Sequence, residues 1–322
     1  MTEALRAVTG RVVWGVPALL RSASIVLATV ALVACSTTGV TRAEPTAPPT
    51  GAATPTASPA PTAPPTAAPT TTPPPDWNAP PVIANDAAAL GTQLATVEAI
   101  IRDPNAPAAQ LAWAGHAEQL CISRLADFPE WTDQVLAALP AGPRATIAAS
   151  IEAGKQLRLL HAGPIPKSLP DWHIVQPPPI DELMSYYKEA EATFGVPWYV
   201  LASINLIETR MGRIRGDSSA GAQGPMQFIP STWAAYGAGG DVNSYRDSIL
   251  AAGRYLKAAG APGDLKKAIF AYNHSSFYVN AVTGYGEAMR ADPSAYRGFY
   301  GWQVYYPTLD GPILMPPGWT KP

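Results

Sequence analysis

Proline is concentrated in two stretches of the chain, and these stretches decide where packed structure can form. Of the 36 prolines, twelve fall between Pro45 and Pro75, in a tract of Pro, Thr and Ala that contains no charged residue. Such a tract cannot bury enough apolar surface to offset the entropy lost on ordering, so we expect a disordered linker over residues 36–80. The second stretch, residues 163–179, cannot continue a helix or a central strand and predicts an extended connection.

Apolar residues outside these two stretches recur at helical spacing. The clearest run places Leu90, Leu94, Val97 and Ile101 at steps of four, three and four, the pattern of an amphipathic helix. Similar spacing predicts helices near 107–125, 129–139, 143–161, 180–194, 197–211, 230–236, 246–259, 264–273 and 275–291. No strongly alternating run lies between them, so the sequence predicts a mostly α fold.

The second proline-dense stretch divides these helices into two groups. We expect a small helical domain at 81–162 and a second helical domain at 180–322. Beyond about Tyr296 the aromatic tail YRGFYGWQVYYPTLDGPILMPPGW shows no periodicity that predicts a helix or a strand.

The first 35 residues predict an export signal. Arg6, Arg11 and Arg21 precede the apolar run SIVLATVALVAC, which is about half of the roughly 20 residues that a membrane-spanning helix needs. The run ends in LVAC, which resembles the bacterial lipobox, so residues 1–35 are expected to be a signal peptide with Cys35 as the lipidated residue. The alternative is an ordinary cysteine late in a cleaved signal. The lipobox implies an exported protein, anchored by its lipid to the outer face of the cytoplasmic membrane or in the cell envelope.

Charge and ligand spacing exclude several functions. The net charge is −2 and no long run of Lys or Arg occurs, so nucleic acid is not an expected partner. Cys121 lies on a helical stripe of small and apolar residues and is expected in the core, which leaves no disulfide framework. We expect no metal and no cofactor, because spacing typical of a metal site is absent around the four histidines, His116, His161, His173 and His274.

A single acid, Glu208, borders the apolar stripe of the helix predicted at 197–211. We expect that helix to end at Gly212, which places Glu208 in its last turn. Burial and the negative end of the helix dipole both raise the pKa of a carboxyl there, and a protonated acid at the edge of an apolar cleft is what general acid catalysis near neutral pH requires. The alternative is a rim residue paired with one of the arginines that follow, Arg210, Arg213 and Arg215.

Two later segments combine flexible backbone with polar side chains. SSAGAQGPMQFIP contains Gly221 and Gly224, which let the backbone approach a ligand closely, and Gln223 and Gln227, whose amides donate and accept hydrogen bonds. LKKAIFAYNHSS places Tyr272 on a helical stripe, with Asn273 beside it. Taken singly, the first segment predicts a surface turn and the tyrosine a core residue.

At these three places together the chain resembles the soluble and membrane-bound lytic transglycosylases of the goose-type-lysozyme superfamily. In that family a catalytic Glu is usually followed by Ser, a Gly-Leu-Met-Gln turn lines the cleft, and an Ala-Tyr-Asn motif closes the opposite wall. The corresponding residues here are Glu208-Thr209, Gly224-Pro225-Met226-Gln227 and Ala271-Tyr272-Asn273. The resemblance covers roughly residues 180–290, so the helices at 81–162 lie outside it.

The resemblance implies a lysozyme-like catalytic domain that cleaves peptidoglycan glycan strands. The bond is the β-1,4 link between N-acetylmuramic acid and N-acetylglucosamine, and the product carries 1,6-anhydro-N-acetylmuramic acid. Most glycosidases use two carboxylates, but here the substrate's acetamido group replaces one, so Glu208 acts as acid and then as base. The implied substrate-binding residues are Thr209, Ser219, Gln223, Gly224, Met226, Gln227, Tyr272 and Asn273.

Two other functions compete with this one. A lysozyme-type hydrolase would activate water with a second carboxylate, for which Asp217 and Asp241 are available in glycine-rich segments. A glycan-binding lipoprotein would keep the fold without turnover, and the acid at position 208 argues against it.

Overall fold

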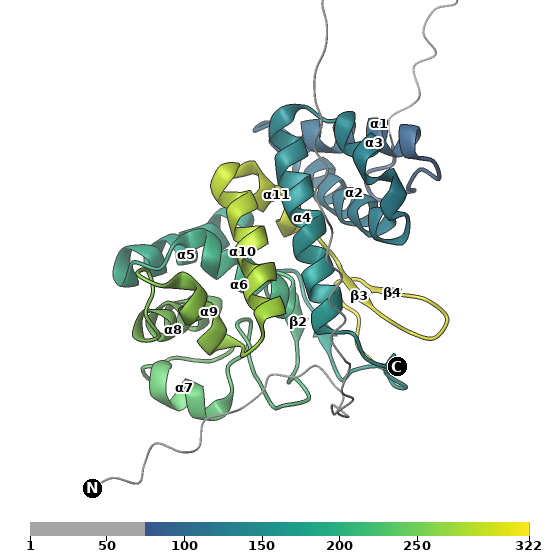
Figure 1. Cartoon of the computed structure of the whole chain (residues 1–322). Helices are drawn as coiled ribbons and strands as arrows, with labels where there is room; N and C mark the ends of the chain where they lie inside the picture. The colour runs from purple at the N-terminus through teal and green to yellow at the C-terminus, as the bar shows by residue number, and fades with distance from the viewer. Residues whose placement is uncertain (1–74, 322) are drawn as a thin grey trace, which may run out of the picture. The chain divides into compact units, whose positions relative to one another are not determined.

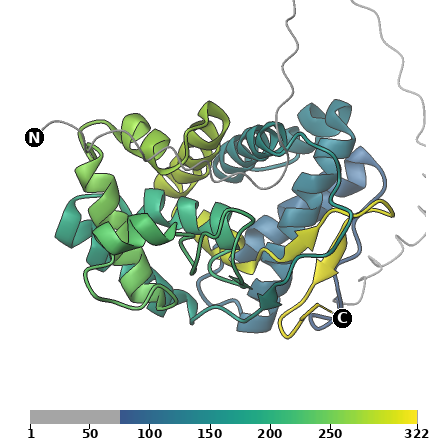
Figure 2. The ribbon, with the colours of Figure 1, turned by 90° about the horizontal axis from the view of Figure 1, so that it is seen from below.

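The computed structural model describes residues 75–321 and is mostly helical (Figures 1 and 2). The predicted signal peptide, Cys35 and nearly all of the predicted linker lie outside the described residues. The end of that linker is packed: the rings of Trp77 and Trp113 meet edge to face at 5.3 Å. Within the described residues, no helix has both the length and the apolar character needed to cross a membrane.

The first group of helices begins at residues that the sequence marks. Asp86 caps the first helix by accepting a hydrogen bond from the backbone N of Ala89 at 2.9 Å, as short acidic side chains do at helix starts. Pro107 and Pro129 stand at or next to helix starts, whereas Pro143 lies within the first turn of a helix that follows Pro140. The elements are α1 (Ala87–Arg102), α2 (Ala108–Asp127), η1 (Pro129–Trp131), α3 (Thr132–Ala137) and α4 (Ala141–Leu160).

The second group follows the proline-dense connection. Gly195 ends its first helix with φ 74°, the left-handed conformation that glycine adopts at helix ends. The elements are α5 (Ile180–Phe194), α6 (Trp198–Thr209), α7 (Pro230–Tyr236), α8 (Tyr245–Ala258), α9 (Leu265–Tyr272), α10 (Ser276–Ala291) and α11 (Ser294–Gly301).

Two small antiparallel pairs complete the fold. β1 (His173–Ile174) pairs with β2 (Ile214–Arg215), and β3 (Val304–Tyr306) pairs with β4 (Ile313–Met315). The aromatic tail, whose sequence shows no periodicity, is therefore structured and contains most of α11 and a β-hairpin. Strands of three residues are too short for an alternating pattern to stand out, and pairing with a neighbouring strand determines them.

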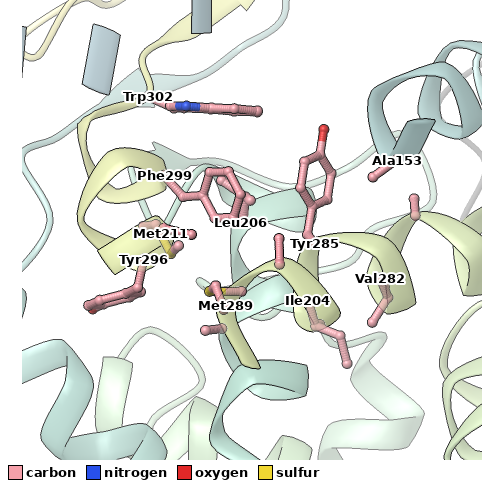
Figure 3. Packing of buried hydrophobic residues seen from close by; sticks show 14 of the residues in the cluster. Ala153, Ile204, Leu206, Met211, Val282, Tyr285, Met289, Tyr296, Phe299 and Trp302 are labelled. Carbon is pink, nitrogen blue, oxygen red and sulfur yellow. The ribbon is translucent and has the colours of Figure 1, made fainter. Parts of the chain in front are cut away.

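The helices on both sides of the proline-dense connection share one core. Residues 76–321 form a single compact unit, in which α4 lies along α10 (Figures 1 and 2). Gly284 allows the two helices to pack closely, since a Cβ at this position would come within 3.0 Å of the Ala153 Cβ. Figure 3 shows Ala153 of α4 in one cluster with Tyr285 of α10 and Trp302 after α11. The expected separation into domains at 81–162 and 180–322 is corrected accordingly, because α10 has apolar faces for both α4 and α6.

Candidate functional site

Glu208 lies in the last turn of a helix that is buried along nearly its whole length. Pro197 precedes that helix, α6, and the Glu191 side chain accepts a hydrogen bond from the Trp198 backbone N at 3.0 Å, which caps its start. The Glu208 side chain is only 4 % exposed. Its Oε1 accepts a hydrogen bond from the Tyr278 hydroxyl of α10 at 2.6 Å. A buried carboxyl with one tyrosine donor is thus the centre of the site.

Burial raises the pKa of Glu208 from 4.5 to about 7, and the hydrogen bond from Tyr278 works against this rise. The direction follows from the cost of placing a charge away from water. Near neutral pH the carboxyl is therefore divided between its acid and base forms.

The three arginines that follow Glu208 bind other groups. Arg210 donates to the Leu206 carbonyl at 3.0 Å, Arg213 donates to the Tyr300 and Trp302 carbonyls, and Arg215 donates to the Asn243 carbonyl at 2.8 Å. The alternative of a rim residue paired with an arginine is therefore wrong.

The turn after α6 is strained and is held by Thr209. The helix ends at Thr209, three residues before the predicted end, because Arg210 and Met211 both adopt left-handed φ values, 54° and 60°. Non-glycine residues in this region cost about 1 kcal/mol or more and persist only where neighbours fix them. The Thr209 hydroxyl accepts from the Gly212 N at 3.0 Å and donates to the Pro225 carbonyl at 2.6 Å.

Thr209 is therefore a residue of the interior. Its side chain is 0 % exposed, so the expected contact with substrate is corrected: the hydroxyl joins the end of α6 to the turn at 224–227. Asn205 strengthens the same link, donating to the Pro225 carbonyl at 2.7 Å and accepting from the Tyr187 hydroxyl at 2.6 Å.

The Gly-Pro-Met-Gln turn packs on α6 through its backbone. Gly224 has φ 72°, and a Cβ there would lie 1.9 Å from the Val242 carbonyl oxygen, so only glycine fits. Met226 is fully buried, which corrects the expectation that its side chain contacts a sugar. Gln227 is also buried, and its Nε2 donates to the Gly224 carbonyl at 3.0 Å.

The Ala-Tyr-Asn motif at the end of α9 meets the same turn. The Tyr272 hydroxyl donates to the Met226 carbonyl at 2.6 Å, and Asn273 follows as the buried C-cap of α9. Burial and then the charge of Glu208 raise the pKa of Tyr272 well above its ordinary value. The structure thus joins the turn at 224–227 to the end of α6, next to Glu208, and to the end of α9.

Glu208 lines a pocket of about 590 Å³. Ile207 and Glu208 of α6 line it together with Asp217 and Ser219, which follow β2. Ser219 is therefore the one predicted binding residue found on its lining. The others, Gln223, Gly224, Gln227, Tyr272 and Asn273, are not among its lining residues.

The two candidate second carboxylates are placed differently. Asp217 lines the pocket with Glu208 and accepts a hydrogen bond from the Gln223 amide at 3.4 Å. Asp241 is not on the lining and accepts instead from the Asn243 backbone N at 2.9 Å. The structure therefore places only Asp217 at the pocket, whereas the sequence alone gave no reason to prefer either aspartate.

Several residues of the site were not predicted from the sequence. Tyr278 falls on the apolar face of a predicted helix, where a tyrosine indicates core, and its partner lies 70 residues away. The far wall of the pocket comes from the proline-dense connection and the aromatic tail, including Trp172, Tyr305 and Tyr306. Their aromatic character was the only available signal.

Among residues 75–321, no three His, Cys, Asp or Glu side chains lie together in a way that could hold a metal ion. His161 lines the pocket with its Nδ1 2.9 Å from the Leu157 carbonyl, so Nδ1 carries the proton. Burial lowers the pKa of His161, which favours the neutral ring.

Similarity to known proteins adds nothing to this geometry. Comparisons of the chain with protein-family models, with curated proteins and with solved structures found no match. Glu208, Tyr278 and the pocket beside them are therefore the features from which a function has to be inferred.

Proposed function

We propose that this protein is a peptidoglycan lytic transglycosylase in which Glu208 is the catalytic acid and base. The observation that carries the proposal is a nearly isolated carboxyl, with a pKa raised to about 7, at the edge of a pocket. The three motifs that resemble this enzyme family are joined by hydrogen bonds at the end of the helix that carries this carboxyl, which supports the proposal.

One carboxyl can perform both proton transfers of this reaction. Protonated Glu208 gives its proton to the glycosidic oxygen as the bond from that oxygen to C1 of N-acetylmuramic acid breaks, and the substrate's N-acetyl carbonyl stabilises the positive centre. Glu208, now a carboxylate, takes the proton of the sugar's 6-hydroxyl while that oxygen bonds to C1. A pKa near the working pH suits a group that must both donate and accept.

Tyr278 has a defined part in this scheme. Its hydroxyl donates to Glu208 Oε1 at 2.6 Å, which fixes the direction of the carboxyl. The same hydrogen bond stabilises the carboxylate that forms after the first transfer. Tyr278 is thus a positioning residue of Glu208.

A lysozyme-type hydrolase is the second candidate, and one observation favours it: Asp217 lines the same pocket as Glu208. In that reaction Asp217 would activate a water that attacks C1, and the product would carry a reducing end. Asp241, which lies off the pocket lining, gives no such support.

The proposed location remains the outside of the cell, with Cys35 carrying a lipid. Cys35→Ala is expected to release the protein from membrane fractions and to abolish incorporation of a labelled fatty acid. Equal membrane association of the variant would contradict the lipid anchor.

Mass spectrometry of digests tests the reaction itself. The purified protein is incubated with peptidoglycan, and products ending in 1,6-anhydro-N-acetylmuramic acid are expected, each lighter by one water than the hydrolytic product. The Glu208→Gln variant is the matched control. Products with reducing ends alone would identify a hydrolase, and binding without products would identify a glycan-binding protein.

A further inference from the structure

The far side of the pocket is an aromatic wall, which we define as residues 164–172 and 304–307. It supplies most of the lining residues of the pocket, which it shares with Ile207 and Glu208 of α6. Both segments lie outside residues 180–290, the part of the chain that carries the family resemblance. The wall is therefore a feature of this chain that its three motifs do not explain.

The aromatic rings of the wall are held in fixed positions. The Tyr306 hydroxyl donates to the Ser168 carbonyl at 3.2 Å, and the Tyr306 ring meets Trp172 edge to face at 5.6 Å and 90°. On the other face of β3, the Tyr305 hydroxyl lies 2.8 Å from His116 Nε2. Side chains alternate along a strand, so β3 directs these two rings to different supports.

The backbone of the wall is also restricted. Four of its residues are prolines, which fix φ and lower the entropy lost on binding: Pro164, Pro166, Pro170 and Pro307. Two of its residues, Trp172 and Val304, also belong to a separate small core that Ile174, Ile214 and Met315 complete. A ligand would therefore meet a surface that is already formed.

The chemistry of this surface fits an uncharged ring with apolar faces and hydroxyl groups. Aromatic rings offer flat apolar area with polar tips at low entropic cost. The acidic groups on the lining, Glu208, Asp171 and Asp217, accept hydrogen bonds from hydroxyls and outnumber the one arginine there, Arg210, which disfavours a phosphate. The volume of about 590 Å³ lies in the range of ligand sites.

We propose that the aromatic wall is a sugar-binding surface, on which the ring of Tyr306 stacks against a pyranose and so holds a glycan strand across Glu208. This inference rests on the proposed function, because it assigns the occupant of the same pocket. Trp172 supports Tyr306 through the edge-to-face contact of their rings. The occupant is the glycan backbone and not the peptide stem, since the wall offers ring faces and few charged partners.

Binding of a peptide-free glycan tests the proposal. An oligomer of β-1,4-linked N-acetylglucosamine is titrated calorimetrically into the full-length protein carrying Glu208→Gln, which removes turnover. Adding Tyr306→Ala is expected to raise the Kd about tenfold, because aromatic stacking and its buried area are lost. Tyr306→Phe keeps the ring and is expected to stay within about twofold of the parent.

Phe270→Ala is the matched control, because Phe270 is an exposed aromatic residue of α9 that is not on the pocket lining. Its Kd is expected to equal that of the parent. Tyr306→Leu, which keeps apolar bulk without the ring, serves if Tyr306→Ala does not fold, and the same tenfold loss is expected.

Unchanged affinity in the folded Tyr306→Ala or Tyr306→Leu protein would overturn the wall as a sugar site. A loss seen only with peptide-bearing glycans would overturn it as well, in favour of a peptide-stem site. Neither result would contradict the proposed function if the protein with native Glu208 still releases 1,6-anhydro products. Absence of any such product would instead refute the function, and the titration would still decide what the wall binds.

Discussion

Glu208 and Glu118 are both buried glutamates on helices, and burial raises the pKa of each, but their surroundings differ. Glu118 Oε2 accepts a hydrogen bond from the Trp302 indole N at 2.8 Å, and the nearby charge of Glu98 adds to the rise of its pKa. Arg102 pairs with Glu98 and, at 2.7 Å, with Asp292. Glu208 has one tyrosine partner and a pocket.

The difference lies in access. A Cβ added at Gly298 would come within 2.6 Å of Glu118 Oε2, so the surroundings of that carboxyl have no room for a ligand. Glu208, in contrast, lines a pocket of about 590 Å³. A raised pKa by itself therefore does not mark a catalytic acid in this protein; open space beside the carboxyl distinguishes the two.

The largest expected effect is that of Glu208→Gln. The amide cannot deliver a proton, so kcat on peptidoglycan is expected to fall about 10³-fold, within the range that general acid–base catalysis contributes. Circular dichroism is expected to match the native protein, because Gln is nearly isosteric with Glu. Undiminished digestion by this variant would place the active site elsewhere and end the contrast between the two acids.

Substitutions of Glu118 are expected to change stability and not activity. Glu118→Ala leaves the Trp302 indole N–H unpaired and opens a cavity, so urea unfolding is expected to show a loss of about 3 kcal/mol. Glu118→Gln keeps an acceptor for Trp302 and is the matched control, expected within about 1 kcal/mol of the native protein. If a folded Glu118→Gln protein no longer digests peptidoglycan, Glu118 is needed for activity and the proposed distinction between the two glutamates is wrong.

The pH dependence of activity sharpens the comparison through Tyr278. Because the acid form of Glu208 is needed, kcat is expected to fall as pH rises through about 7. Tyr278→Phe removes the donor that favours the carboxylate, so this alkaline limb is expected to move to higher pH, together with a lower maximal rate from poorer positioning. If the alkaline limb of Tyr278→Phe stays at the pH of the native protein, the pKa of Glu208 does not determine that limb.

The raised pKa of Glu208 also makes the free energy of unfolding depend on pH. The folded pKa of Glu208 is raised from 4.5 to about 7, so the folded protein binds the proton more tightly than the unfolded chain between these values. This stabilisation is complete below pH 4.5 and is lost as pH rises through 7. Relative to Glu208→Gln, the free energy of unfolding is expected to fall by about 3 kcal/mol across that window, as measured by urea titrations at several pH values.

The smallest expected effect is that of Asp217→Asn. If the 6-hydroxyl attacks, no second carboxylate is required, and the variant is expected to keep most of its activity, within about threefold, with unchanged 1,6-anhydro products. Asp241→Asn, off the pocket lining, is the control. Loss of activity in Asp217→Asn alone, with reducing ends in the digest, would favour the hydrolase.

Local patterns in the sequence were sufficient for much of the fold. The predicted helices at 180–194 and 230–236 coincide with α5 and α7, and the helix predicted at 275–291 matches α10 to within one residue. The burial of Glu208 and the rise of its pKa also follow from its place in the last turn of an apolar helix. These features depend on neighbours within a few turns of the same helix, which periodicity records.

Contacts between distant segments were decided only by the tertiary structure. The hydrogen bond from Tyr278 to Glu208, the burial of Thr209 and Met226 behind the site, and the choice of Asp217 over Asp241 each depend on which elements pack together. The aromatic wall joins a proline-dense connection to a short hairpin, and neither has a periodicity that predicts the other. Helical spacing thus specifies which face of each element is buried, whereas the partner of that face, and the open space left beside Glu208, are set by packing across the whole chain.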